Sequence, residues 1–147
     1  MSRADQAVTI ARRWIGTPYR HQATREGAGS DCLGLLRGIW REMYGAEPEP
    51  VPPYTSDWAD PRKDELLLSA AMRWLVPRPI DCEDTGDVLL FRMRHGALAQ
   101  HVGIQSGIGT APAFIHAYDR HGVIESPLSQ PWRRRVAARF AFPEETA

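Results

Sequence analysis

Apolar residues recur every three or four positions in three stretches of the first half of the chain, a spacing that predicts amphipathic helices. Each stretch follows a residue type that caps helix starts and precedes a Gly or Pro that ends helices. The predicted helices run from Ser2 to Ile15, from a cap at Ser30 or Asp31 to Tyr44 before Gly45, and from Asp60 to about Pro77. The second helix opens at Cys32, which places a thiol at a helix start.

The second half of the chain changes to short segments that are rich in Val, Ile and Phe and separated by Gly or Pro. Such segments are typical of strands in an antiparallel sheet. The predicted strands are Asp87–Met93, His101–Ser106, Ala113–Tyr118, Gly122–Glu125 and Val136–Phe142. Helices first and strands second predict an α+β fold, in which N-terminal helices pack on a small antiparallel sheet.

A proline-rich stretch separates the second and third predicted helices. Five of the twelve prolines lie between Gly45 and Pro61, and they exclude a helix or a central strand there. We expect an extended surface loop that walls a groove or docks a partner. The basic run Arg133–Arg135 is interpreted as the solvated lead-in to the last strand, with docking to an acidic partner as the alternative.

Length and charge narrow the class of protein. A chain of 147 residues, of which 43% are hydrophobic, predicts a single domain over residues 1–147. Its 18 basic and 18 acidic residues cancel, which excludes an overall field that attracts nucleic acid or an anionic membrane. No apolar run approaches the roughly 18 residues of a membrane span, and Met1–Ile15 lacks the apolar centre of a signal peptide. We therefore expect synthesis in the cytoplasm, no membrane insertion, and any export by another route.

The cysteine count points to a reactive thiol. Cys32 and Cys82 are too few for a disulfide framework or a four-thiolate zinc site. A thiol with a pKa of about 8.5 is only a few per cent ionised at pH 7, and the thiolate is the nucleophile. A helix N-terminus stabilises a thiolate by about 0.3 to 1 kcal/mol, or up to roughly 2 kcal/mol when partly buried. Cys32 therefore needs a neighbouring imidazolium to complete its ionisation.

Two histidines in adjacent predicted strands can supply that imidazolium. His101 begins one strand and His116 lies within the next, so a hairpin would place them side by side, one as base and the other as its orienter. The helix start also presents unpaired backbone N–H groups, including that of Cys32, to charge that develops on an attacked carbonyl. The sequence thus offers the parts of a cysteine hydrolase.

Taken singly, each of these residues has an ordinary structural explanation. A cysteine on an apolar helix face is usually a small core residue, a strand histidine is usually buried with its hydrogen bonds made, and Tyr19 beside Pro18 is a packed aromatic. The other cysteine and histidines are interpreted as solvated loop residues: Cys82, His21, His95 and His121. Cys32 and the two strand histidines also fit a metal site by ligand type, but no metal-binding spacing supports it.

Five short motifs occur in a fixed order: Gly16-Thr17-Pro18-Tyr19, Asp31-Cys32-Leu33-Gly34-Leu35, Gly86-Asp87-Val88-Leu89-Leu90-Phe91, His101-Val102-Gly103-Ile104 and Ile115-His116-Ala117. Together they resemble the motif set of the NlpC-type cell-wall cysteine peptidases, from about Ala7 to the last strand. The residues that flank the cysteine are similar to the branch of that family encoded in the tail gene clusters of phages and gene transfer agents: Tyr19-Arg20-His21-Gln22 and Leu33-Gly34-Leu35-Leu36-Arg37-Gly38.

The resemblance implies a papain-like α+β fold and a thiol-dependent peptidoglycan hydrolase that needs no metal or organic cofactor. By position, Cys32 matches the nucleophile, His101 the general base and acid, and His116 the residue that orients it. Tyr19 matches a tyrosine whose hydroxyl lines the site, and Asp31 an acidic residue in the substrate cleft. The family hydrolyses peptide bonds in the stem or cross-links of peptidoglycan, often the bond after a γ-linked D-glutamate.

The similarity to the tail branch implies a partner and a location. We expect the protein to sit at the tip of a phage-like tail, bound to tail hub or baseplate proteins, and to open the cell wall during DNA delivery without recognising nucleic acid sequence. A tail tip would also provide a high effective concentration at the wall.

Three features depart from the family pattern. Many members have Ser where this chain has Leu33, which changes one flank of the cleft. The charged stretch Gln22–Gly29 replaces a Gly-rich approach to the cysteine, and Gly45–Leu75 is an insertion that would shield the cleft until the particle meets a wall.

Two other function classes remain open at this stage. One is a catalytically silent tail-hub adaptor that docks through the proline loop and Arg133–Arg135. The other is acyl transfer to or from lipid on the same fold, which the lack of an apolar anchor disfavours.

Overall fold

The computed structural model describes residues 1–51, 61–93 and 101–145. For residues 61–66 it describes the backbone but not the side chains. His95 and residues 52–60 of the proline loop lie outside the described residues. The chain order of the elements is α1 (Arg3–Trp14), β1 (Thr24–Arg25), β2 (Gly29–Ser30), α2 (Cys32–Tyr44), α3 (Pro61–Trp74), β3 (Val76–Arg78), β4 (Val88–Phe91), β5 (His101–Gly107), β6 (Ala113–Tyr118), β7 (Gly122–Pro127), α4 (Gln130–Arg135) and β8 (Val136–Ala141).

The three predicted helices are confirmed, with the caps that fix their ends. Ser2 caps α1, because its Oγ accepts the N–H of Asp5 at 3.0 Å. Asp31, not Ser30, caps α2, which ends at Gly45 in a positive-φ conformation that glycine adopts without a steric penalty. The helix α3 ends at Trp74, two residues before the chain enters β3.

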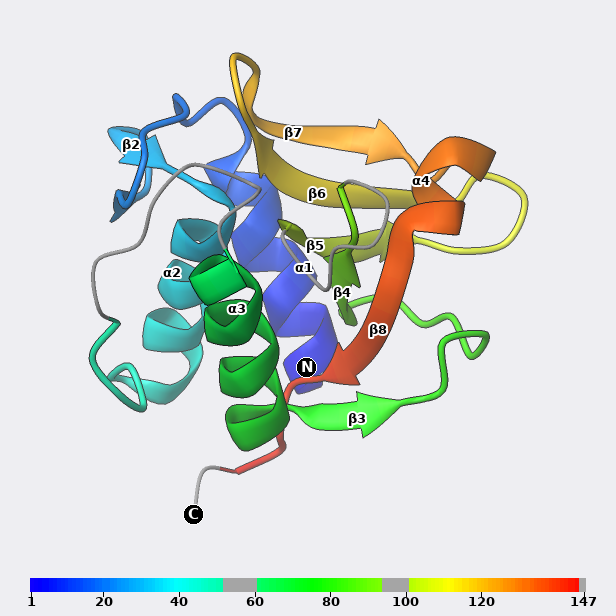
Figure 1. Ribbon diagram of the computed structural model, residues 1–147, viewed down its shortest axis with the longest axis horizontal. Coiled ribbons are helices and arrows are strands. Elements are labelled where there is room, and N and C mark those ends of the chain that lie inside the picture. The colour runs from blue at the N-terminus through cyan, green and yellow to red at the C-terminus, as the bar shows by residue number, and fades with distance from the viewer. Residues whose placement is uncertain (52–60, 94–100, 146–147) are drawn as a thin grey trace.

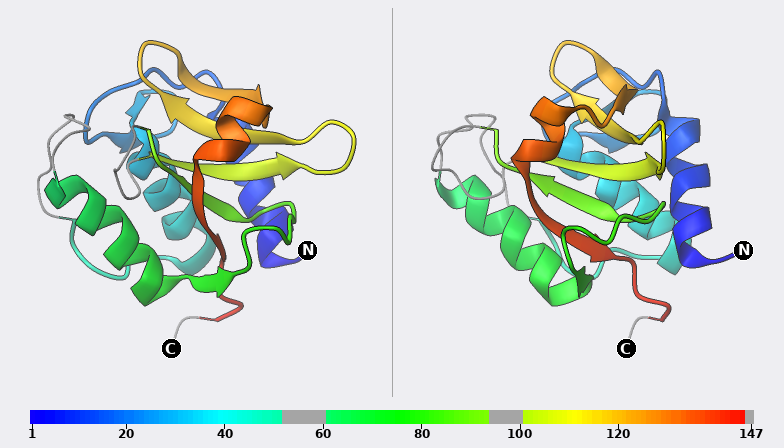
Figure 2. Two further views of the ribbon diagram at one scale, coloured as in Figure 1. Left: turned by 45° about the vertical axis from the view of Figure 1, so that its right-hand side comes forward. Right: turned by 90° about the vertical axis from the view of Figure 1, so that its right-hand side faces the viewer.

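The strands form an antiparallel sheet in the order β3-β8-β4-β5-β6-β7 (Figure 1). The five predicted strands are therefore confirmed, with ends that differ by a few residues. Helices α1 and α2 pack together and against β5, and α2 also contacts β6. Figure 1 shows that β5 begins and β6 ends on the side of the sheet nearest β2 and the start of α2, and Figure 2 gives the same arrangement from two other sides.

Two parts of the chain differ from the sequence-based prediction. The basic run Arg133–Arg135 lies in the short helix α4, not in a strand lead-in, because Pro131 suits the first turn of a helix. Residues 76–78 form the edge strand β3, where Pro77 is tolerated because an edge strand leaves N–H groups unpaired. The charged stretch Gln22–Gly29 forms most of a hairpin of the short strands β1 and β2, which ends at Ser30.

A buried polar cluster joins β5, β8 and the turn before β4. The Arg139 Nη1–H group donates to Asp87 Oδ2 at 2.9 Å and to Gln105 Oε1 at 2.6 Å. Burial raises the pKa of Asp87, while hydrogen bonding and charge from Arg139 act in the opposite direction. Gly86 has a φ of 87°, and a Cβ there would lie 2.5 Å from Ala4 atoms. The Gly86-Asp87 motif therefore seats the sheet against α1.

Candidate active site

The start of α2 is held by the carboxylate of Asp31. Its Oδ1 accepts the N–H of Gly34 and its Oδ2 accepts the N–H of Gln22, each at 2.7 Å. The side chain is almost entirely buried, and the exposed His21 lies 3.9 Å from Oδ2. The structure thus places Asp31 beneath the cysteine as the cap of its helix, with both carboxylate oxygens in use.

Gly34 lets the preceding loop lie directly against this helix start. A Cβ on Gly34 would be 1.9 Å from the carbonyl oxygen of Ala23, a distance that no real Cβ reaches. Thr24 closes the same contact, because its Oγ1–H donates to the carbonyl of Gly34 at 2.6 Å. The Asp31-Cys32-Leu33-Gly34 motif is therefore a device that fixes the first turn of α2.

Cys32 is the first residue of α2, and only 5% of it is exposed. The thiol thus lies where the helix dipole favours a negative charge. Cys82, by contrast, is an exposed cysteine in the loop between β3 and β4. Because α2 packs against both β5 and β6, the helix with the thiol and the strands with the histidines form one packed unit.

The two strand histidines are hydrogen-bonded to each other, as the hairpin argument predicts. His101 Nε2 and His116 Nδ1 are 2.7 Å apart, and both rings are buried. His116 Nε2 in turn lies 2.8 Å from the Oγ of Ser126 on β7. A chain of three polar groups thus runs from the start of β5 across β6 to β7.

Burial decides the charge of the middle ring. It lowers the pKa of His116 to about 3, with a smaller effect from a positive charge on His121. His116 is therefore a neutral imidazole near pH 7, with one N–H donor and one lone pair. A neutral ring hydrogen-bonded on both sides orients its neighbour without adding a second charge.

Gly103 provides the space that the histidine pair needs. Extending the Ile104–Ile115 pairing of β5 and β6 by one residue brings Gly103 opposite His116. A Cβ on Gly103 would lie 2.9 Å from the ring of Phe114 and 3.3 Å from the Cβ of His116. The glycine of the His101-Val102-Gly103-Ile104 motif is thus explained by this close approach.

The sequence analysis missed two residues of this site, Ser126 and Trp132. The indole of Trp132, on α4, lies 5.2 Å from the His116 ring and 5.9 Å from the His101 ring, centroid to centroid. It also packs on Phe91 at 5.4 Å. Ser126 carries no sequence signal, because its place beside His116 depends on the register of β6 and β7. Trp132 carries none, since α4 has no apolar periodicity.

Tyr19 lies beside the cysteine helix. It bridges to Ser30, two residues before Cys32, and its ring is partly buried against the main core. Burial raises the pKa of the Tyr19 hydroxyl, and negative charge on Cys32, Asp31 and Asp119 adds to the rise. The hydroxyl therefore remains protonated at neutral pH, and its role in lining the site stays a prediction.

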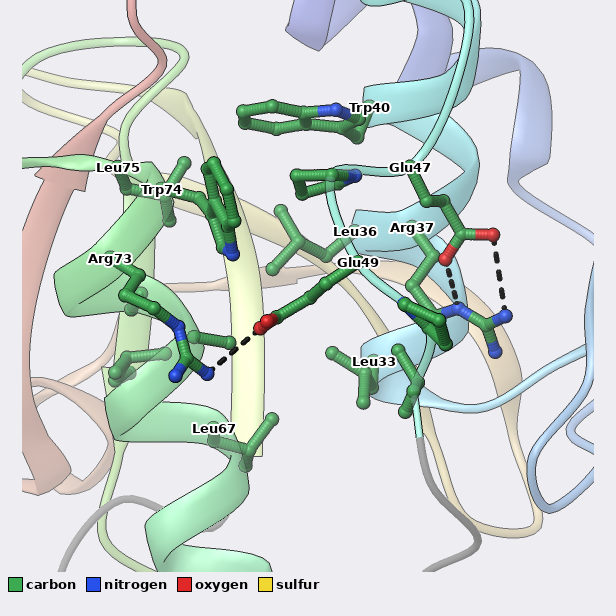
Figure 3. A pocket seen from close by; sticks show the side chains of 16 residues that line it. Leu33, Leu36, Arg37, Trp40, Glu47, Glu49, Leu67, Arg73, Trp74 and Leu75 are labelled. Atoms are coloured by element: carbon green, nitrogen blue, oxygen red, sulfur yellow. Dashed lines mark hydrogen bonds and ion pairs between the residues drawn. The ribbon is translucent and has the colours of Figure 1, made fainter.

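Leu33 turns away from these polar groups into an apolar pocket of about 220 Å³ between α2 and α3. Figure 3 shows Leu33 and Leu67 at one end of this pocket, and Trp40 and Leu75 at the other. Ion pairs of Glu47 with Arg37 at 2.5 Å and of Glu49 with Arg73 at 2.8 Å attach the segment 47–49 to both helices. The residue that departs from the family pattern thus packs toward the described part of the insertion.

The described residues form neither a metal site nor a membrane span. Within residues 1–51, 61–93 and 101–145, no three His, Cys, Asp or Glu side chains gather as ligands for a metal ion. None of the helices in these ranges has the length and apolar character needed to cross a membrane.

Comparisons with known proteins identify relatives by sequence and by fold. The chain is 32% identical over 123 residues to the Murein DD-endopeptidase MepS/Murein LD-carboxypeptidase of Escherichia coli (strain K12), over 83% of this chain and 54% of the relative. It is 25% identical over 142 residues to the Gamma-DL-glutamyl hydrolase of Bacillus subtilis (strain 168), over 95% of this chain and 29% of the relative. The chain thus spans about half the length of the first curated relative, and no protein-family model matches it.

Solved structures show the same fold. NlpC1 from Trichomonas vaginalis superposes with a TM-score of 0.68 at 17% identity, over 96% of this chain and 44% of that one. An NlpC/P60 family protein from Bacillus cereus superposes with a TM-score of 0.67 at 21% identity, over 95% of this chain and 40% of that one.

The fold class is therefore the α+β fold of NlpC/P60 proteins, as the motif order predicts. The sequence similarity extends over 54% of the murein endopeptidase, and the NlpC/P60 structures share their fold with this chain.

Proposed function

We propose that this protein is a cysteine peptidase that hydrolyses peptide bonds in the stem peptides or cross-links of peptidoglycan. The observation that carries the proposal is the buried chain from His101 through neutral His116 to Ser126, in strands that pack against the helix with Cys32 at its start. The name of one relative, a murein endopeptidase, supports a peptide of the cell wall as the substrate, and that of another, a γ-DL-glutamyl hydrolase, supports a γ-glutamyl bond.

The hydrogen-bonded chain is compatible with one set of proton positions that suits this mechanism. In this set, neutral His116 donates its Nε2–H to Ser126 and accepts the Nε2–H of His101 at Nδ1. The Nδ1 of His101 is then the atom that takes the proton of the Cys32 thiol. The imidazolium and the thiolate stabilise each other, and His116 orients the imidazolium without competing for the proton.

The reaction proceeds through a thioester. The Cys32 thiolate attacks the scissile carbonyl carbon, and the backbone N–H groups at the start of α2 stabilise the oxyanion. The C–N bond breaks as the His101 imidazolium gives its proton to the leaving amine. Water then attacks the thioester with His101 as base, which releases the acid and restores the thiol of Cys32.

Digestion of purified sacculi tests the proposal. We expect the wild-type protein to release soluble fragments whose masses identify the cleaved peptide bond. Cys32→Ala should release none, whereas Cys82→Ala, which removes the exposed cysteine, should act as the wild type. Equal release by the wild type and Cys32→Ala would contradict the proposal and leave a non-catalytic role, such as that of an adaptor.

We further propose that the protein acts from the tip of a phage-like tail, bound to hub or baseplate proteins, after synthesis in the cytoplasm. The support is the similarity of the residues around Cys32 to the tail-encoded branch of the family. Mass spectrometry of purified tail particles from the producing strain tests this. We expect this chain in the tail-tip fraction, and its absence from intact particles would contradict the assignment.

A further inference from the structure

The apolar pocket of about 220 Å³ between α2 and α3 is separate from the proposed catalytic groups, because its lining includes none of Cys32, His101 and His116. Apolar side chains of the two helices form much of its wall (Figure 3), and the described part of the proline-rich stretch closes another side. Pro48 and Pro50 on that side have no backbone N–H group that would need a partner. A cavity of about 150 Å³ with apolar walls holds one benzene molecule. This pocket therefore has room for a molecule somewhat larger than a single aromatic ring.

The charged side chains that line the pocket neutralise one another. Glu47 pairs with Arg37 at 2.5 Å, and Glu49 pairs with Arg73 at 2.8 Å. These four are the charged residues of the lining. A charged ligand would have to break one of these pairs or leave its own charge unpaired beside apolar walls, and either change costs free energy. The pocket therefore favours a neutral occupant.

One polar group of the wall lacks a hydrogen bond. Trp74, the last residue of α3, lines the pocket, and Figure 3 shows its indole nitrogen on the edge that faces Glu49. This Nε1–H group is buried and donates to no acceptor in the part of the chain that the structure describes. The carboxylate of Glu49 is paired with Arg73 instead. Because buried donors in folded proteins are nearly always hydrogen-bonded, this one indicates an acceptor that a ligand supplies.

We propose that this pocket binds a small neutral molecule that combines an apolar body of about one ring with one hydrogen-bond acceptor, such as a carbonyl oxygen. The apolar body lies between α2 and α3, and the oxygen accepts the N–H of Trp74. Such a site has the usual form of a small-molecule site, in which apolar walls supply affinity and one polar group fixes the orientation. A stem peptide of peptidoglycan, with several free charges, does not suit it. The site is thus independent of the proposed peptidase reaction.

Acetophenone and ethylbenzene test this, because they have nearly the same shape and differ in that a carbonyl group replaces a methylene group. Calorimetric titration of the wild type should give a Kd roughly tenfold lower for acetophenone, since ethylbenzene leaves the buried donor unpaired. In two-dimensional NMR spectra of the indole N–H groups, the signal that Trp74→Phe lacks should move downfield with acetophenone. Equal affinities for the two probes, or no binding of either, would overturn the proposal.

Three variants locate the binding site. Trp74→Phe removes the donor but keeps an aromatic wall, so it should bind the two probes with equal affinity. Ala70→Phe places a ring in the pocket and should bind neither probe. Ser69→Phe is the matched control, because Ser69 is exposed on the same helix and does not line the pocket, and both Kd values should stay as in the wild type. A preference for acetophenone that survives Trp74→Phe, or wild-type binding by Ala70→Phe, would contradict the assignment.

Discussion

The ring of His116 is buried from water and forms two hydrogen bonds, one with His101 and one with Ser126. These bonds link the protonation states of the three side chains. Burial keeps the His116 ring neutral, so it has a single N–H to place. In the proposed mechanism, Ser126, whose Oγ lies 2.8 Å from Nε2, accepts that proton and Nδ1 is the acceptor for His101. We therefore propose that Ser126 positions His101 through the ring of His116.

Removing the hydroxyl of Ser126 should therefore weaken catalysis without altering substrate binding. We expect Ser126→Ala to lower kcat roughly threefold to tenfold at unchanged KM, the effect of one neutral hydrogen bond. Ser126→Thr keeps the hydroxyl and should restore most of the activity. Ser129→Ala is the matched control, because Ser129 is exposed and its side chain makes no capping bond. Steady-state kinetics on one peptide measures all three variants, and a wild-type kcat for Ser126→Ala would contradict the proposed role.

The sequence predicts a candidate residue when a side chain with suitable chemistry lies at the start of a predicted helix or strand. Cys32 follows a capping Asp31, and His101 begins a strand, so both stand out along the chain. Ser126 and Trp132 do not, because their places depend on strand register and on a helix that packs across the sheet. The structure gives Asp31 the buried capping position and leaves its place in the cleft a prediction.

At the scale of elements, the first turn of α2 is the part on which the site depends most. Its carboxylate cap, its tight contact with Ala23 and the hydrogen bond from Thr24 all act within four residues of the thiol. A shift of this turn would move the thiol relative to the two strands.

Gly34→Ala tests this dependence. Alanine favours a helix over glycine by about 1 kcal/mol, but its Cβ would meet the backbone carbonyl of Ala23 at 1.9 Å. Because overpacking typically costs about 1 to 3 kcal/mol, we expect the clash to offset or exceed the gain and to displace the helix start. Hydrolysis should fall at least tenfold while the far-UV circular dichroism stays native. Full activity in Gly34→Ala would show that the close contact does not position the thiol.

The same scale shows why some elements escaped prediction. The caps of α1 and α2 lie three residues from the groups that they bind, so sequence spacing finds them. The strand β3 exists because it pairs with β8 more than 60 residues away, and no local pattern marks it. The helix α4 is short and lacks an apolar stripe, so its tertiary contacts decide its place.

At the scale of the whole molecule, the buried site makes folding depend on pH. The pKa of His116 is about 3 in the folded protein and about 6.5 in an unfolded chain. Between these two pH values the unfolded state binds more protons than the folded state, so the free energy of unfolding rises with pH. The contribution of His116 is therefore lost progressively as the pH falls below about 6.5. The contribution is at most about 1.4 kcal/mol per pH unit.

Urea unfolding between pH 7 and pH 4.5 measures this effect. We expect the free energy of unfolding of the wild type to fall across this range and that of His116→Gln to fall less steeply. The carboxylates whose pKa values are lowered by hydrogen bonds to Arg13 and Ser106, Glu42 and Glu125, lose their contribution only at lower pH. Parallel pH profiles for the wild type and His116→Gln would contradict the assignment of a neutral buried ring.

The α+β class and the antiparallel sheet follow from patterns that span the whole chain, and the structural neighbours confirm them. The pairing between a helix start and a strand start is of another kind. The proposed pair, Cys32 and His101, is 69 positions apart in the sequence, so thiol chemistry suggests the pair but no local pattern fixes its distance.

The rate of Cys32 alkylation as a function of pH tests the central claim most directly. In Cys82→Ala, where Cys32 is the remaining cysteine, iodoacetamide reports the thiolate fraction. We expect a rate that is nearly constant from pH 6 to pH 8 and that becomes strongly pH-dependent in His101→Gln. A wild-type rate that rises roughly 100-fold over this range, as for an ordinary thiol with a pKa of about 8.5, would contradict the account.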